Sequence, residues 1–289
     1  MSNDYFEFQQ FRIEQSQCAM KVSTDACLLG AAVDLNTATR LLDIGTGTGL
    51  LALMAAQRHA SVEIVAVEIA ETAAAQAAAN VAGSPWSSRI QVRAQGLAEY
   101  AATQPSPFSH IICNPPFFRR SLRSPDAARS TARHTADDTL SFGALANFAQ
   151  EFLQPAGLLT VLLPPPEMQA FEQVATAAGL YPATRLMVRH RPGSRPLRHI
   201  TGFRRATGAA RETELAIRSA DDDTQYSVEF RTLLAGFYLA LYRGFLVRGQ
   251  PCWLQTKSPR YNSSFSKPSF SRCRLSSRSF SSVPNSAAV

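Results

Sequence analysis

The sequence predicts an α/β protein in which a mostly parallel, doubly wound sheet carries helices on both faces. From residue 40 onward, short apolar runs of strand length alternate with longer segments of helical periodicity. Two of these runs, 40–44 and 110–113, end in rigid turns rich in glycine or proline. With 289 residues, 45% of them hydrophobic, the chain is long enough to bury one large core.

The elements of this sheet can be assigned in chain order. Strands are predicted over 40–44, 62–67, 90–93, 110–113 and 158–163, and segments 183–188 and 200–204 close the sheet. Helices are predicted over 49–58, 71–81, 141–153 and 166–178. A last strand over 214–218 and a helix over 227–241 follow, and we expect this helix to pack back on the core.

The two ends of the chain differ from this central pattern. Residues 1–35 are predicted to form an ordered extension, with a short strand at 11–14 and a helix at 24–33 capped by Ser23 or Thr24. Residues 36–241 form the main domain. Residues 242–289 are rich in serine, proline and basic side chains without a structural period, which is typical of a disordered tail.

Composition excludes several classes of protein. The first 17 residues carry acids and amides where a signal peptide would be basic and then apolar, and no apolar run approaches the roughly 18 residues of a membrane span. We therefore expect a cytoplasmic protein without membrane contact, acting as a monomer. The five cysteines form no CxxC pair, so we expect reduced thiols and no metal site.

The net charge of +7 is unevenly distributed. Residues 242–289 contain eight basic side chains and no acid, so subtracting them leaves −1 for the first 241 residues. The total charge is therefore poor evidence for the partner of the main domain, and local clusters must decide.

A glycine-rich turn follows the first strand of the sheet. Residues 41–49 read LLDIGTGTG, and Leu50 comes directly after Gly49, so the spacing differs from the G-x-G-x-x-G of dinucleotide sites. Led by Asp43, this turn suits a nucleoside with a charged amino-acid tail, such as S-adenosyl-L-methionine, and Gly45, Gly47 and Gly49 let it lie on the backbone. Glu68 ends the next strand, 19 residues after Gly49, where it is expected to accept both ribose hydroxyls.

The strand at 110–113 runs into the sequence NPPF at 114–117. Two prolines fix the turn, so the side-chain oxygen of Asn114 and the carbonyl oxygen of Pro115 are expected to accept hydrogen bonds from one amino group. An amino group on an aromatic ring is a poor nucleophile, and two acceptors would aim its lone pair at a sulfonium methyl group. We expect Phe117 to stack on the base that enters the pocket, and Asn114 to contact the methyl donor as well.

Four segments carry a resemblance to a known family: CAMKVSTD at 18–25, DIGTGTG at 43–49, NPPFF at 114–118 and ARH at 132–134. Over about residues 11–241 the chain resembles class I methyltransferases of the N6-adenine group, specifically the bacterial tRNA1(Val) (adenine(37)-N6)-methyltransferase family. The resemblance implies a Rossmann-like, seven-stranded sheet with one antiparallel strand at its edge. It also implies that residues 21–25 lie over the cofactor, with Lys21 or Thr24 near its methionine end, and that the substrate is an anticodon-loop adenine.

One position departs from the family pattern. Where an acid usually follows the third strand and meets the adenine of the cofactor, this chain reads RAQGL at 93–97. Gln95 or Glu99 would have to take the place of the missing acid.

Two arginine clusters indicate contact with RNA phosphates. One, from 185 to 205, contains no acid and includes two histidines; its arginines are Arg185, Arg189, Arg191, Arg195, Arg198, Arg204 and Arg205. The other follows the NPPF turn and contains Arg119, Arg120, Arg123, Arg129 and Arg133. We expect Pro116, Phe118, Arg119, Arg133, Arg191 and Arg195 to contact the tRNA substrate, and His134 and His190 to be contacts or surface residues.

Two alternatives remain open at this point. The same turn acts on other planar amino groups, so guanine N2 of ribosomal RNA and the glutamine of a translation release factor are possible substrates. The missing third-strand acid would also be compatible with a non-catalytic RNA-binding or cofactor-sensing protein, against which the intact NPPF turn argues.

Overall fold

The computed structural model describes residues 4–18, 20–115 and 140–239. Their strands are β1 (Tyr5–Glu7), β2 (Arg12–Glu14), β3 (Arg40–Ile44), β4 (Glu63–Glu68), β5 (Ile90–Ala94), β6 (Phe108–Cys113), β7 (Leu153–Leu163), β8 (Tyr181–Arg189), β9 (Pro196–Arg204) and β10 (Arg211–Ala216). Their helices are α1 (Thr24–Ala32), α2 (Leu50–Arg58), α3 (Glu71–Ala82), α4 (Leu97–Ala102), α6 (Phe142–Phe152), α7 (Pro165–Ala177) and α8 (Val228–Leu234), with a 3-10 turn at Ser87–Arg89.

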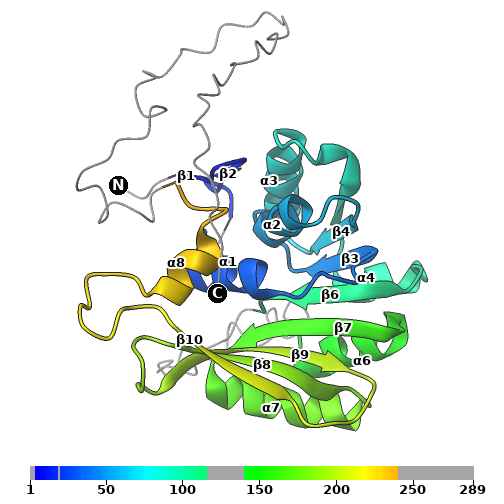
Figure 1. The fold of residues 1–289 in the computed structure, drawn as a ribbon. Helices are drawn as coiled ribbons and strands as arrows, with labels where there is room; N and C mark the ends of the chain where they lie inside the picture. Colours follow the sequence, from blue (N-terminus) through cyan, green and yellow to red (C-terminus); the bar gives the residue numbers. More distant parts are fainter. Residues whose placement is uncertain (1–3, 19, 116–139, 240–289) are drawn as a thin grey trace, which may run out of the picture. The chain divides into compact units, whose positions relative to one another are not determined.

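A mixed sheet of eight strands forms the centre, in the order β10-β8-β9-β7-β6-β3-β4-β5 (Figure 1). The predicted doubly wound, mostly parallel sheet is confirmed, because β9 alone among these strands runs antiparallel to its neighbours. Two details of the prediction were wrong. Within the described residues the sheet has eight strands rather than seven, since β10 adds to β8, and the antiparallel strand lies between β7 and β8 rather than at the edge.

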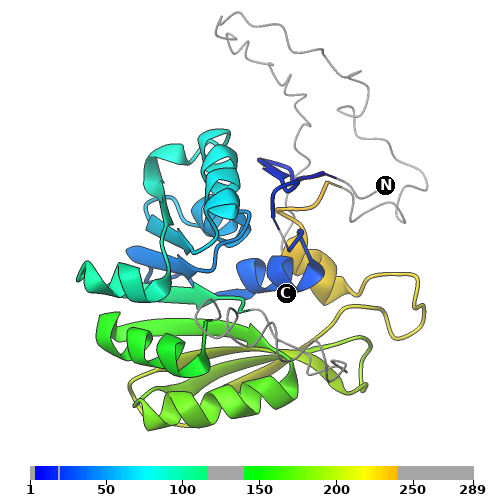
Figure 2. The ribbon, with the colours of Figure 1, turned by 180° about the vertical axis from the view of Figure 1, so that it is seen from behind.

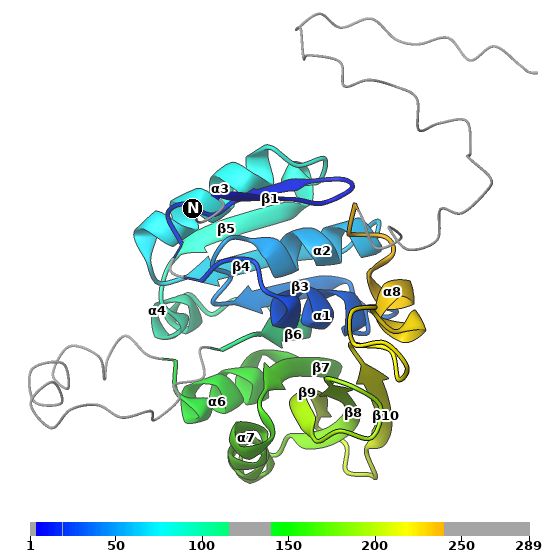
Figure 3. The ribbon, with the colours of Figure 1, turned by 90° about the vertical axis from the view of Figure 1, so that its left-hand side faces the viewer.

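Helices cover both faces of the sheet (Figures 2 and 3). Alternate strand residues enter two separate cores: Leu41 and Ile64 pack in the core that includes α1, α2 and α8, whereas Leu42 and Val65 pack in the core beneath α4, α6 and α7. Burial on both faces explains why the central strands are continuous apolar runs in the sequence.

The order of the strands fixes where a ligand can bind. The chain winds outward from β3 through β4 to β5 and then returns to the other side of β3 with β6. At such a switch point the loops after neighbouring strands separate and leave a crevice at the carboxyl ends of the strands. The loops that meet there are those following Ile44, Glu68, Ala94 and Cys113.

The two ends of the described chain are fastened together. β1 and β2 form an antiparallel hairpin, and its connecting residue Gln9 donates from its backbone nitrogen to the carbonyl oxygen of Phe237 at 2.9 Å. The side-chain amide of Gln9 also donates to the carbonyl oxygen of Tyr238 at 2.8 Å. These bonds join segments more than 220 residues apart, and we refer to residues 8–9 and 235–238 as the terminal clasp.

Candidate functional site

The glycine turn after β3 adopts a conformation that needs glycine. Gly45 and Gly47 have φ of +69° and +56°, where side chains are strained. The backbone nitrogens of Gly45 and Thr46 donate to the carbonyl oxygen of Val67, at 2.9 and 3.0 Å. A Cβ atom at Gly45 or Gly47 would meet no atom within 4 Å, so the turn leaves open space where a ligand can lie against the backbone.

Asp43 lies completely buried beneath this turn. Its Oδ2 accepts hydrogen bonds from Thr46 Oγ1 at 2.5 Å and from the backbone nitrogen of Ala52 at 3.2 Å. Its Oδ1 is buried and has no partner among the residues that the structure describes. The pKa of Asp43 is raised to about 7, mainly because burial disfavours the charged carboxylate. The hydrogen bonds from Thr46 and Ala52 lower this pKa, and the negative charge of Glu68 raises it.

Glu68, at the end of β4, holds the turn from the other side. Its Oε2 accepts from the backbone nitrogen of Gly47 at 2.9 Å, and its Oε1 accepts from the backbone nitrogen of Ala70 at 3.1 Å. Each carboxylate oxygen has a second lone pair, so these bonds leave Glu68 able to accept from a ligand as well.

A pocket of about 270 Å³ opens directly above the turn. The glycine turn and the first residues of α2 form its floor, and the segment that leads into α1 forms its upper wall. The pocket is lined by Met20, Lys21, Val22, Ser23, Ala26, Gly45, Thr46, Gly47, Thr48, Leu50, Leu51 and Asn114. The structure thus brings together Lys21, the glycine turn and Asn114, which lie far apart in the sequence.

Asn114 follows the last residue of β6 and contributes to the pocket wall. Its Oδ1 is buried and has no hydrogen-bond partner among the described residues. A buried amide oxygen without a partner is costly, so this atom is an acceptor available to a bound donor group. Pro115 is buried next to it, whereas Pro116, Phe117, Phe118, Arg119 and Arg133 lie outside the described residues.

Five of the predicted cofactor residues are not among those that line the pocket: Thr24, Asp43, Gly49, Glu68 and Gln95. Thr24 begins α1, but the helix is capped by Ser23, whose Oγ accepts from the backbone nitrogen of Ala26 at 3.2 Å. Gln95 follows β5, next to the strand end that carries Glu68. Glu99 is used locally, because its Oε2 accepts from the backbone nitrogen of Gly96 at 3.1 Å and so caps α4.

The fold supplies acids to the arginine cluster at 185–205, although none occurs in that stretch of sequence. The guanidinium of Arg185 lies 2.6 Å from carboxylate oxygens of both Glu172 and Glu212. Arg189 pairs with Glu214 at 2.7 Å. In the fold, therefore, α7 and β10 balance the positive charge of two of the seven arginines of this cluster.

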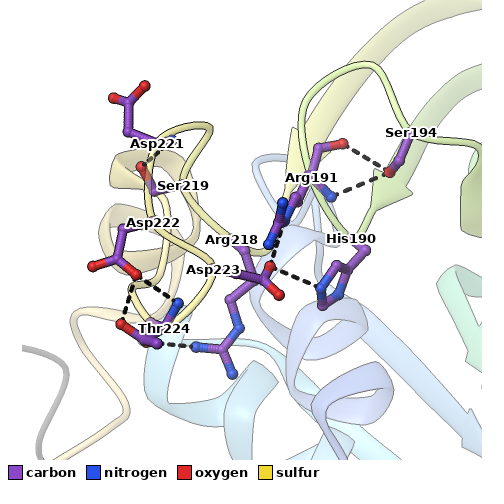
Figure 4. Close-up of polar contacts among 9 residues, drawn as sticks. All are labelled: His190, Arg191, Ser194, Arg218, Ser219, Asp221, Asp222, Asp223 and Thr224. Atoms are coloured by element: carbon purple, nitrogen blue, oxygen red, sulfur yellow. Dashed lines mark hydrogen bonds and ion pairs between the residues drawn. The ribbon is translucent and has the colours of Figure 1, made fainter.

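The same holds at the connection between β8 and β9 (Figure 4). Arg191 Nε lies 2.5 Å and His190 Nε2 lies 3.0 Å from Oδ1 of Asp223, which comes from the loop before α8. The hydrogen bond from Arg191 lowers the pKa of Asp223 to about 2. Arg195 in this connection is exposed and has no ion pair or hydrogen bond with any residue in the described part of the chain.

Sequence reasoning missed two residues of this site. Thr46 lies inside the glycine turn, and its hydroxyl holds Asp43. Asn80 lies on α3, where its amide bonds to Thr48 of the turn. The sequence feature that could have indicated Asn80 is its place in an alanine-rich helix, because asparagine is a poor helix former among good ones.

Two negative findings apply to the described residues. No group of three or more histidine, cysteine, aspartate or glutamate side chains among them could hold a metal ion. None of their helices combines the length and apolar character needed to cross a membrane.

Comparisons with known proteins agree on a family. The model of the methyltransferase small domain matches residues 18–177. A protein of Bacteroides fragilis is 41% identical over 242 residues, covering 83% of this chain and 100% of its own length, and one of Serratia proteamaculans is 44% identical over 238 residues, covering 81% and 89%. Both are named tRNA1(Val) (adenine(37)-N6)-methyltransferase.

A solved structure is similar in fold alone. A predicted O-methyltransferase from Agrobacterium tumefaciens superposes with a TM-score of 0.54 at 22% identity, covering 74% of this chain and 96% of its own. The similarity supports a class I methyltransferase fold and carries no information on substrate.

Proposed function

Because the chain belongs to the methyltransferase small-domain family, and within it to the tRNA1(Val) (adenine(37)-N6)-methyltransferases, we propose that it methylates N6 of adenine 37 in the anticodon loop of tRNA(Val). The methyl donor is S-adenosyl-L-methionine. The relatives support the reaction, and the geometry of the pocket supports the assignment of residues to it.

One observation carries the assignment: Oδ1 of Asn114 is buried at the wall of the pocket and has no hydrogen-bond partner in the described part of the chain. An adenine amino group has two hydrogens and a lone pair delocalised into the ring. Acceptance of one hydrogen by Asn114 Oδ1 and of the other by the Pro115 carbonyl oxygen would draw the nitrogen toward a tetrahedral shape. The reaction is then accelerated by orientation, without a strong general base.

The residues around the glycine turn fit the methyl donor. Gly45 and Gly47 leave open space beside the backbone, Glu68 has free acceptor capacity for ribose hydroxyls, and Lys21 lines the upper wall near the expected methionine end. S-adenosyl-L-methionine supplies an electrophilic methyl group on a sulfonium. We propose that Gln95 contacts the adenine of S-adenosyl-L-methionine and that Thr24 supports the upper wall of the pocket. Asp43 and Gly49 shape the glycine turn.

The tRNA contacts are proposed from charge and position. Arg195 is exposed and uncommitted within the described residues, so a phosphate is a suitable partner for it. Arg191 would have to exchange Asp223 for a phosphate. Pro116, Phe117, Phe118, Arg119 and Arg133 remain predicted contacts of the base and its neighbours.

The test is incubation of the purified protein with S-adenosyl-L-methionine and unmodified tRNA, followed by nucleoside mass spectrometry. We expect N6-methyladenosine with the wild type and with Asn36→Ala, an exposed asparagine before β3, and a strongly reduced initial rate of its formation with Asn114→Ala. Replacement of adenine 37 by guanine should abolish the product. Methylation of ribosomal RNA or of a release factor, with unmodified tRNA left unchanged, would overturn the proposed substrate.

We further propose a monomer in the cytoplasm, where its tRNA substrate is found, and a division into residues 1–35, 36–241 and 242–289. Truncation after residue 241 tests the last boundary. Unchanged stability and methylation would make the tail dispensable, and a loss of tRNA affinity alone would make it an auxiliary RNA-binding arm.

A further inference from the structure

Asn80 is a buried polar residue in a helix made mainly of alanine. Asn80 is 5% exposed, and it lies on the face of α3 that packs against β2 and the glycine turn. Since burial of an amide is costly unless its hydrogen bonds are made, such a residue is retained in a helix core for the partners it holds.

Its side chain makes three hydrogen bonds of 2.9 Å. Oδ1 accepts from the backbone nitrogen of Glu14, and Nδ2 donates to the backbone carbonyl oxygen of the same residue. Nδ2 also donates to the carbonyl oxygen of Thr48. The amide therefore pairs with Glu14 as a neighbouring strand residue would, and its second N–H reaches the glycine turn.

Both partners lead into the pocket. Thr48 is part of the floor. On the other side, Glu14 is followed by Gln15, which is buried and whose Oε1 accepts from the backbone nitrogen of Val22 at 2.8 Å. Val22 belongs to the upper wall. A continuous path of short bonds thus runs from the floor through Asn80 to the wall.

The other end of the wall is anchored separately. Asp25, in the first turn of α1, pairs with Arg198 of β9 at 2.7 Å, and both side chains are three-quarters buried. The wall is therefore held against the sheet at its far end by an ion pair, and against the glycine turn at its near end by Asn80.

We propose that Asn80 is a positioning residue that sets the spacing between the floor and the wall of the methyl-donor pocket. The inference rests on the proposed function, because it identifies the pocket with the donor site. Asn80 is not among the residues that line the pocket, so its loss should weaken donor binding while leaving methyl transfer in the saturated enzyme nearly intact.

The test compares Asn80→Ala with Ser109→Ala. Ser109 is also buried, and its Oγ also makes three backbone hydrogen bonds, with Thr39 and Arg40. It lies near the amino end of β6, however, whereas the pocket is at the carboxyl ends of the strands. We expect Asn80→Ala to raise the Kd for S-adenosyl-L-methionine at least about tenfold, which is about 1.4 kcal/mol, with kcat at saturating donor within about threefold. Ser109→Ala should lower thermal stability without changing the Kd.

Asn80→Asp provides a second variant of nearly the same shape. Its carboxylate would place an oxygen against the carbonyl oxygens of Glu14 and Thr48, so it should weaken donor binding as Asn80→Ala does. If neither variant folds, hydrogen exchange of the wild type decides. Addition of S-adenosyl-L-methionine should then slow exchange at Glu14 and Val22 together with the turn, and protection of the turn alone would overturn the inference.

The outcomes separate the two proposals. A wild type that fails to bind S-adenosyl-L-methionine would overturn the proposed function and this inference with it. A wild type that binds, together with an unchanged Kd for the folded Asn80 variants, would overturn the inference alone. An equal rise in Kd for Ser109→Ala would also overturn it, because a general loss of stability would then explain the effect.

Discussion

Replacement of Asp43 by asparagine should change how the stability of the protein depends on pH. Burial raises the pKa of this carboxyl from 3.8 to about 7. A pKa that is higher in the folded than in the unfolded state means that the folded chain favours the protonated form. The contribution of Asp43 to stability is therefore complete below about pH 4 and is lost as the pH rises through about 7.

The size of the effect follows from these two values. With a pKa of 3.8 unfolded and about 7 folded, proton linkage predicts that Asp43 lowers the free energy of unfolding by about 2 to 3 kcal/mol between about pH 5 and about pH 8. In Asp43→Asn this part of the pH dependence disappears. Contributions from other groups, including His110, whose pKa burial lowers, occur in both proteins and cancel in the comparison.

Urea unfolding of the donor-free protein at these two pH values measures the difference directly. Glu151→Gln, which removes an exposed carboxyl on α6, is the control and should keep the wild-type dependence. Parallel pH dependences for the wild type and Asp43→Asn would refute the reasoning, because they would mean that Asp43 is already charged, or already neutral, throughout the range.

Three further predictions concern activity, RNA binding and packing. Asn114→Ala should lower kcat by about 100- to 1,000-fold, since an orienting acceptor acts mainly in the transition state. The measurement is the rate of single-turnover methylation, and an unchanged rate would contradict the prediction. Arg195→Ala should weaken tRNA binding and reduce the slope of log affinity against log salt by about one; a slope equal to that of the wild type would remove Arg195 from the interface. Gly157→Ala should cost about 1 to 3 kcal/mol in urea unfolding, because the new Cβ would lie 2.7 Å from Leu153 Cγ and 2.9 Å from the Ser109 carbonyl oxygen, and a neutral result would show that this packing relaxes.

The central strands were predictable because burial on both faces makes them continuous apolar runs. β3 was predicted with the bounds that the structure gives, Arg40–Ile44. The errors fall where this signal weakens. β10 was predicted at 214–218 but spans Arg211–Ala216, most of whose residues are exposed, and the predicted helix 227–241 is described as a helix only to Leu234. β1 and the six-residue α4 were missed, since neither is long enough to show a period.

For the site, motifs predicted which segments meet but not how they are held. The glycine turn, Glu68 and Asn114 could be placed together because the carboxyl ends of adjacent parallel strands share one edge. The acids that pair with four arginines of the cluster could not be predicted, because they come from other elements. Asn80 was missed for the same reason: its partners are backbone atoms of residues 66 and 32 positions away, and no side-chain pattern encodes them.

The terminal clasp bears on how the molecule is made. Residues 8–9 leave the ribosome well before the groups to which they bond, because those groups, at 235–238, lie more than 220 residues later in the sequence. Closing so long a loop costs conformational entropy, and the hydrogen bonds that offset this cost cannot form until both segments are present. We therefore expect pairing there to come late in folding. Until then the nascent hairpin, with Phe8 and Phe11 destined for the core, has an apolar side exposed. Completion of the fold therefore waits for residues 235–238, and the hairpin is among the last parts to be protected.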